Sequence, residues 1–158
     1  PAKRWPTAHY GALAAALERS LHGRIPLSHA MGITVLDAAP ARVVLGAPLA
    51  PNVNHSGTVF GGSAASVAVL AAWALVEVRL QAAGLPGRIV IRRSAMDFGR
   101  PIGADCTATA TPGSGDGWDR LASSLRRGRM GRIVVHSTLE CEGERVGELK
   151  GEFAVIPS

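Results

Sequence analysis

Aromatic residues and cysteines are both scarce in this chain of 158 residues. Aromatics make up 4% of the sequence although 47% is hydrophobic, so alanine, valine and leucine must fill the core. The two cysteines, Cys106 and Cys141, show no CxxC or zinc-type spacing. This pattern predicts free thiols in a reducing compartment, and we expect a cytoplasmic protein without a metal or other cofactor.

Long apolar runs are almost absent, and the one exception extends from Ser63 to Val78. It falls short of the ~20 apolar residues that a membrane span needs, and glycines and charged residues border it. Basic residues near Pro1 are not followed by the apolar stretch of a signal peptide. We therefore expect no membrane segment, and we expect residues 1–158 to form a single domain.

The net charge of +5 is moderate, and its densest part is a short run of arginines. Such a run can be a solvated turn between two elements, or it can bind phosphates through the planar guanidinium groups. No helix-turn-helix, RNP-type or zinc pattern accompanies it, so nucleic acid is not an expected partner. The arginines of this run are Arg126, Arg127, Arg129 and Arg132.

The pattern of apolar residues predicts a long central helix together with a mostly antiparallel sheet. The central helix, from Ser63 to about Ala83, is apolar nearly all round and must be buried on most sides. A sheet that curls around it satisfies this need, which predicts an α+β fold. The other predicted helices are Thr7–His22 and Trp118–Arg127, and the predicted strands are Ile33–Asp37, Arg42–Ala47, Arg88–Phe98, Asp105–Thr111, Arg132–Glu142 and Arg145–Ile156.

A glycine-rich loop leads into the central helix through Gly61 and Gly62. The first N–H groups of a helix have no partner inside the helix and lie at its positive end. They are suited to hold an anion or a carbonyl oxygen. The structural alternative is that two glycines merely allow a tight entry into a crowded helix.

The order of these elements resembles the hot-dog fold, in which a sheet wraps a central helix. Small hot-dog thioesterases of the phenylacetyl-CoA type carry Asn, two residues, Gly, two residues and then His-Gly-Gly at the start of this helix. The same spacing here joins Asn54, Gly57 and Phe60-Gly61-Gly62.

Two further segments sharpen the resemblance. Residues 96–103, Met-Asp-Phe-Gly-Arg-Pro-Ile-Gly, resemble an Arg-Pro strand-and-turn segment of the same superfamily. The phrase Ile-Pro-Leu-Ser-His-Ala-Met-Gly at residues 25–32, followed by the glycine-rich loop, is similar to the YiiD C-terminal family of thioesterase-like domains. The resemblance covers residues 25–157 and leaves 1–24 as an N-terminal helical extension.

The resemblance implies a thioester site at this loop, with the amides of Gly61 and Gly62 as the oxyanion hole. Asn54 is either a group that orients water or substrate or a turn former. His55 is either a base, a phosphate ligand or a solvated loop residue. At least one of the hydroxyl residues is expected to be a helix cap or a back-bonded helix residue. The expected substrate-binding residues are Gly57, Thr58, Phe60, Ser63 and Ser66, with the arginine run for the carrier's phosphates.

Two departures from the family pattern remove its obvious acid and base. Phe60 stands where the family has a histidine before Gly-Gly, and Val69 stands where the phenylacetyl-CoA type places its acid. Asp97 is then the candidate carboxylate, from the same subunit or its partner. The structural alternative is a surface carboxylate paired with Arg93 or Arg100.

The first hypothesis is therefore a thioesterase that acts on acyl-CoA or acyl carrier protein, with water as nucleophile. The second is a hot-dog module that binds an acyl chain or acyl-CoA without turnover. A hydratase or dehydratase of the same fold is weaker, because it needs an acid–histidine pair that the loop lacks. A half hot-dog sheet leaves an edge to be covered, so the resemblance implies a homodimer or a dimer of dimers.

Overall fold

The structure, a computed structural model, describes residues 7–113 and 117–158. Each predicted helix and strand is present, and its ends lie within two residues of the predicted ones. A short helix α2 and the 3-10 helix η1 precede the central helix α3. The elements are α1 (Thr7–Arg24), α2 (Pro26–Ala30), β1 (Thr34–Ala39), β2 (Arg42–Ala47), η1 (Ala50–Asn52), α3 (Gly61–Ala83), β3 (Gly87–Phe98), β4 (Cys106–Thr111), α4 (Gly117–Arg126), β5 (Gly131–Cys141) and β6 (Glu144–Pro157).

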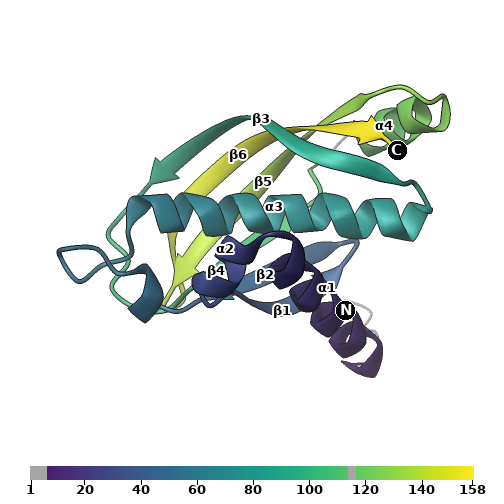
Figure 1. Ribbon diagram of the computed structural model, residues 1–158. Helices are drawn as coiled ribbons and strands as arrows, with labels where there is room; N and C mark the ends of the chain where they lie inside the picture. Colours follow the sequence, from purple (N-terminus) through teal and green to yellow (C-terminus); the bar gives the residue numbers. More distant parts are fainter. Residues whose placement is uncertain (1–6, 114–116) are drawn as a thin grey trace.

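The six strands form one antiparallel sheet in the order β1-β2-β4-β5-β6-β3. The sheet curves around α3, which lies along its concave side (Figure 1). Because β3 pairs with β6 and not with β4, the last strand of the chain lies inside the sheet and β3 lies at its edge. The predicted α+β arrangement, the hot-dog fold, is confirmed.

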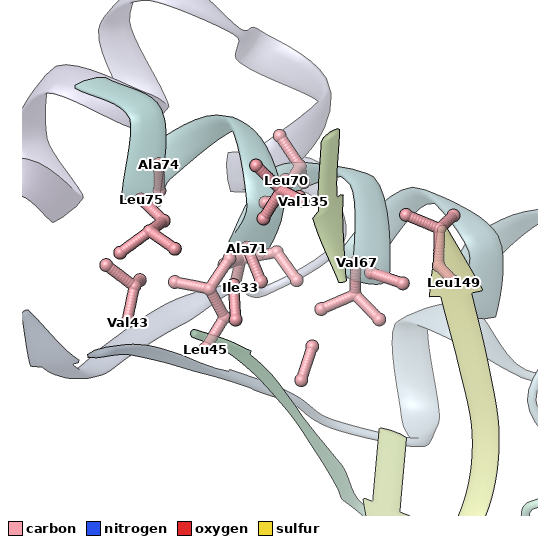
Figure 2. Packing of buried hydrophobic residues seen from close by; sticks show 14 of the residues in the cluster. Ile33, Val43, Leu45, Val67, Leu70, Ala71, Ala74, Leu75, Val135 and Leu149 are labelled. Carbon is pink, nitrogen blue, oxygen red and sulfur yellow. The ribbon is translucent and has the colours of Figure 1, made fainter. Parts of the chain in front are cut away.

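Helix α3 supplies one side of the hydrophobic core. Val67, Ala71 and Leu75 are between 0% and 1% exposed and point toward the sheet. In Figure 2, Leu75 lies near Val43 and Ala71 near Leu45 of β2, whereas Val67 lies nearer to Leu149 of β6. By length and composition α3 could cross a membrane, but 61% of its most apolar window is buried inside the fold. This burial is what the core helix of a globular domain requires.

One apolar stripe of α3 is not covered by the sheet. Ala65, Ser66, Val69 and Trp73 are each only partly buried, and they follow one another at helical spacing. The expectation that α3 is buried on most sides is thus met, with this stripe as the exception.

The two edges of the sheet differ in their cover. The β1 edge meets α1, where Glu18 Oε1 accepts a hydrogen bond from the Val35 N–H at 2.8 Å. The β3 edge has no strand paired on its outer side within the described residues. Ile91 on β3 is 42% exposed. An uncovered edge of this length is a template for pairing with another strand.

The two cysteines are free thiols, as predicted, and both are buried. They lie opposite each other on β4 and β5. Burial, together with the nearby Cys141 and Asp105, raises the pKa of Cys106 to about 11. Since the thiolate is the reactive form, Cys106 is a poor nucleophile at neutral pH.

We predict that Leu75→Ala lowers the free energy of unfolding by about 2–5 kcal/mol, because Leu75 is fully buried between α3 and the sheet. Leu36→Ala is the matched control, since Leu36 is 58% exposed on β1 and its loss is expected to cost within about 0.5 kcal/mol. Urea denaturation followed by circular dichroism measures both values. Equal losses for the two variants would contradict the assignment of α3 to the core.

Candidate active site

The start of α3 presents backbone donors that have no partner. Phe60 is the N-cap residue, and its side chain makes no capping hydrogen bond. The first helical bond runs from the Ala64 N–H to the Phe60 carbonyl at 3.0 Å. Among the residues that the structure describes, no acceptor is found for the N–H groups of Gly61, Gly62 and Ser63. These amides form a donor cluster at the positive end of a long helix.

Asn52 holds this helix start in place. Its side chain is buried, and its Nδ2 donates to the carbonyls of Met31 and Pro48, each at 2.8 Å. The backbone carbonyl of Asn52 accepts a hydrogen bond from the Phe60 N–H at 2.7 Å. Asn52 was not identified from the sequence, which offers two asparagines in Pro-Asn-Val-Asn and no signal that tells the buried one from the partly buried one.

Asn54 organises the loop before the helix. Its Oδ1 accepts the N–H groups of Ser56 at 2.8 Å and Thr58 at 3.1 Å, and its Nδ2 donates to Thr58 Oγ1 at 3.0 Å. Gly57 closes the turn with a φ of +77°, which favours glycine. The Asn54 side chain therefore acts as a turn former here, and its catalytic role stays a prediction.

The other polar residues of the motif differ in exposure and in whether their side chains make hydrogen bonds. His55 is exposed on the loop, and no hydrogen bond of its side chain is found in the described structure. Ser66 Oγ donates to the Gly62 carbonyl at 2.7 Å, so the prediction of a back-bonded helix residue is confirmed for Ser66. Ser63, in the first turn of α3, is partly buried beside the donor cluster.

Two aromatic rings flank the glycines. A Cβ on Gly62 would lie 2.3 Å from the Phe60 ring, and a Cβ on Gly61 would lie 3.6 Å from the Phe98 ring. Gly62 therefore lets the Phe60 ring fold back over the helix start. Phe60 and Phe98 remain 58% and 59% exposed. They give the donor cluster apolar neighbours, and the Phe98 contact was not anticipated from the sequence.

Asp97 belongs to the end of β3 that reaches the helix start, but it projects from the other face of the strand. Successive strand residues alternate in direction, and the neighbouring Phe98 contacts Gly61. No ion pair found in the described residues includes Asp97, and Arg100 pairs with Glu144 instead. A single chain thus does not bring this carboxylate to the amides, and its catalytic role stays a prediction.

The arginine run lies at the opposite end of α3. Arg126 ends α4, beside Leu80 and Ala83 near the end of the central helix. Since α3 has 23 residues, its two ends are about 34 Å apart. Figure 1 shows α4 and the loop before α3 at opposite ends of the molecule. Within one chain, the arginines and the donor cluster do not form one site.

An apolar groove of about 400 Å³ follows the uncovered stripe of α3. Val69 lies in its middle, so the position of the family's acid is part of an apolar surface here. Ser66 is the polar residue in the lining, close to the donor cluster. The groove is lined by Ile25, Leu27, Ala65, Ser66, Val69, Leu70, Trp73, Ile89, Ile91 and Phe153.

Residues 7–113 and 117–158 contain no group of three or more His, Cys, Asp or Glu side chains placed to hold a metal ion. The described site combines backbone amides and loop residues with an adjoining apolar groove.

Solved structures of several bacterial proteins share this fold. A "putative thioesterase" from Shewanella oneidensis superposes with a TM-score of 0.85 at 26% identity, over 93% of this chain and 99% of that one. A "probable thioesterase" from Pseudomonas aeruginosa has a TM-score of 0.77 at 21% identity, over 91% and 95%. A thioesterase from Haemophilus influenzae has a TM-score of 0.72 at 15% identity, over 91% and 90%. The last two, below 25% identity, show the fold alone.

The family described as "Putative thioesterase (yiiD_Cterm)" matches residues 14–157 of this chain. The match includes the loop, the central helix and every strand, and it begins inside α1. The chain therefore belongs to the YiiD C-terminal family of thioesterase-like proteins.

Proposed function

We propose that this chain hydrolyses the thioester of an acyl-CoA or an acyl carrier protein. The observation that carries the proposal is the cluster of unpartnered amides at Gly61, Gly62 and Ser63, which opens beside an apolar groove. A thioester needs both features, because its carbonyl oxygen needs donors and its acyl chain needs an apolar surface.

In the proposed reaction, the amides of Gly61 and Gly62 donate to the carbonyl oxygen of the thioester. Water attacks the carbonyl carbon and gives a tetrahedral intermediate whose negative oxygen gains most from these donors. The intermediate expels the thiolate of the carrier, which takes up the proton lost by water. The products are a carboxylic acid and a free thiol.

Two side chains are candidates for activating the water. His55 lies on the loop that leads to the donor cluster and is free to turn toward a bound thioester. Asp97 lies on the strand whose end contacts Gly61 through Phe98. Asn54 acts indirectly in this proposal, because its hydrogen bonds to Ser56 and Thr58 fix the loop.

The proposed functional unit is a homodimer that pairs the β3 edges of two copies. The β1 edge is occupied by α1, whereas the β3 edge is open and carries the exposed Ile91. A two-fold axis would pair β3 with itself in antiparallel fashion and make one continuous sheet. The same contact would bring a second copy over the uncovered stripe of α3. Two such dimers could associate further.

This pairing also gives the arginine run a role. Antiparallel pairing puts the Phe98 end of one β3 beside the Gly87 end of the other. Gly87 pairs with Pro157 at the end of β6. Two residues earlier on β6, Val155 pairs with Gly131 of β5, and Arg132 follows Gly131. The arginines of one copy would thus approach the donor cluster of the other, where they could bind the phosphates of the carrier.

A second candidate function is an acyl-binding module without turnover. Phe60 and Val69, at the positions where the phenylacetyl-CoA type has a histidine and an acid, cannot transfer protons. The two functions share the groove and the donor cluster, and turnover distinguishes them.

We predict that the purified protein hydrolyses acyl-CoAs and that Asn54→Ala lowers kcat by about 10²-fold, since a loosened loop misplaces the donors. His55→Ala and Asp97→Ala test the candidate bases, and loss of the pH dependence of kcat identifies the one that acts. Thiol release during hydrolysis is the measurement. Background rates for wild type, together with measurable acyl-CoA binding, would contradict the hydrolase and favour the binding module.

We predict a mass in solution of at least twice 16.3 kDa by light scattering, because the β3 edge is expected to pair. Ile91→Glu is expected to shift the mass toward the monomer by placing a charge in the contact. Leu36→Glu is the matched control, because Leu36 is an exposed apolar residue, at 58%, on the covered β1 side. A monomeric wild type, or equal effects of both variants, would contradict pairing through β3.

We predict that the double variant Arg129→Ala and Arg132→Ala raises KM for acyl-CoA about tenfold, since charge-assisted bonds to phosphates are lost. KM for the matching acyl-pantetheine, which lacks the distal phosphates, is expected to stay constant. Arg19→Ala, an exposed arginine on α1, serves as the control. Salt should raise KM for acyl-CoA in wild type more than in the double variant. Equal behaviour of the two proteins would remove the arginine run from the site.

A further inference from the structure

The groove along α3 has a direction. Its α3 lining residues, Ala65, Ser66, Val69, Leu70 and Trp73, recur at helical spacing, so the groove runs parallel to the helix axis. Its near end lies one turn beyond Gly61 and Gly62, where Ser66 Oγ bonds the Gly62 carbonyl. From there on, the lining is apolar. A thioester whose carbonyl meets the donor cluster can therefore lay its acyl chain along this groove.

Trp73 stands at the far end of this lining. The Arg24 guanidinium carbon lies 5.2 Å from the centre of the Trp73 ring, in a cation–π contact. Arg24 also binds Glu77 Oε1 at 3.1 Å, and the Gln81 amide donates to the same oxygen at 3.0 Å. The Arg24 guanidinium thus ties the Trp73 ring to a charged cluster. Glu77 follows Trp73 by four residues on the same face of α3, so the apolar lining is followed by a charged residue there.

We infer that Trp73 sets the length of the acyl chain that this protein accepts. The inference rests on the proposed function, since it assumes that the groove holds the acyl part of a thioester. It goes further by naming the substrate class, which is a medium-length saturated acyl chain, and the residue that limits it.

The dimensions of the groove fix the expected length. From Ala65 to Trp73 the helix rises about 12 Å, and roughly 5 Å more separates Ala65 from the donor cluster. An extended chain advances about 1.2 Å per bond, as extended polypeptide does. The full span of about 17 Å would hold roughly 14 bonds, but the Trp73 side chain leans toward the helix N-terminus over the preceding turn and removes roughly 3 to 5 Å of this span. The groove therefore accommodates an acyl chain of roughly ten to twelve carbons.

The test is a chain-length series of saturated acyl-CoAs, assayed with wild type and Trp73→Ala. For wild type, kcat/KM is expected to rise about fourfold per added methylene, as burial of each methylene requires, and to stop rising near ten to twelve carbons. Trp73→Ala should move this break to chains longer by about three or four carbons. Trp73→Phe should move it less, and it retains a ring should the alanine variant fail to fold.

Trp118→Ala is the matched control. Trp118 also lies under an arginine, with the Arg79 guanidinium carbon 4.4 Å from its ring, but it belongs to α4 and does not line the groove. Its replacement is expected to leave the break where wild type has it. A break that stays in place in both Trp73 variants, or that moves equally in Trp118→Ala, would overturn the assignment of Trp73.

A binding series separates this inference from the proposed function. Acyl-CoA analogues in which a methylene replaces the sulfur keep the carbonyl and cannot be hydrolysed, and their affinities are measured by calorimetry. A break in affinity that moves with Trp73→Ala, in a protein without turnover, would support the Trp73 limit and refute the hydrolase. If the protein hydrolyses acyl-CoAs but kcat/KM shows no break at any chain length, the limit set by Trp73 is refuted and the hydrolase is not. Absence of both turnover and binding would refute both.

Discussion

The fold depends on the burial of α3, a helix of 23 residues that is apolar on nearly every side. An antiparallel sheet can cover most of such a helix only by curving around it, and the six strands do so. The cover is incomplete, because the stripe through Val69 and Trp73 stays partly open. This remaining apolar surface links the fold to the proposed function, since a substrate chain and a second subunit are both means of removing it from water.

The same helix supplies the backbone donors on which the proposed function rests. Its first amides lack partners because the N-cap residue, Phe60, has no side chain that accepts hydrogen bonds. The loop that presents them is fixed by two asparagines with separate tasks: Asn52 anchors the helix start from within the core, and Asn54 shapes the turn. With Phe60 and Val69 in place of a histidine and an acid, the proposed reaction relies on backbone electrostatics more than on side-chain acid–base chemistry. Such donors cannot be lost by substitution without rebuilding the helix start.

Much of this structure is predictable from the sequence, because local rules decide it. Apolar periodicity located the helices and strands, and the spacing of Asn54, Gly57 and Gly61-Gly62 located the loop. What the sequence left open depends on contacts between distant segments. Nothing local tells Asn52 from Asn54, directs the Asp97 side chain away from the helix start, or puts the arginine run at the far end of α3. The role of Trp73 also needed the fold, because Arg24, Glu77 and the groove meet only through tertiary packing.

The central claim is that the amides at the start of α3 receive the thioester carbonyl oxygen. Backbone NMR tests it most directly, by titrating the protein with a medium-chain acyl-CoA analogue that carries a methylene in place of the sulfur. The account predicts that the amide proton resonances of Gly61 and Gly62 move downfield more than those elsewhere in the chain, because each gains a hydrogen bond. Saturable binding of the analogue that leaves both resonances in place would contradict the account.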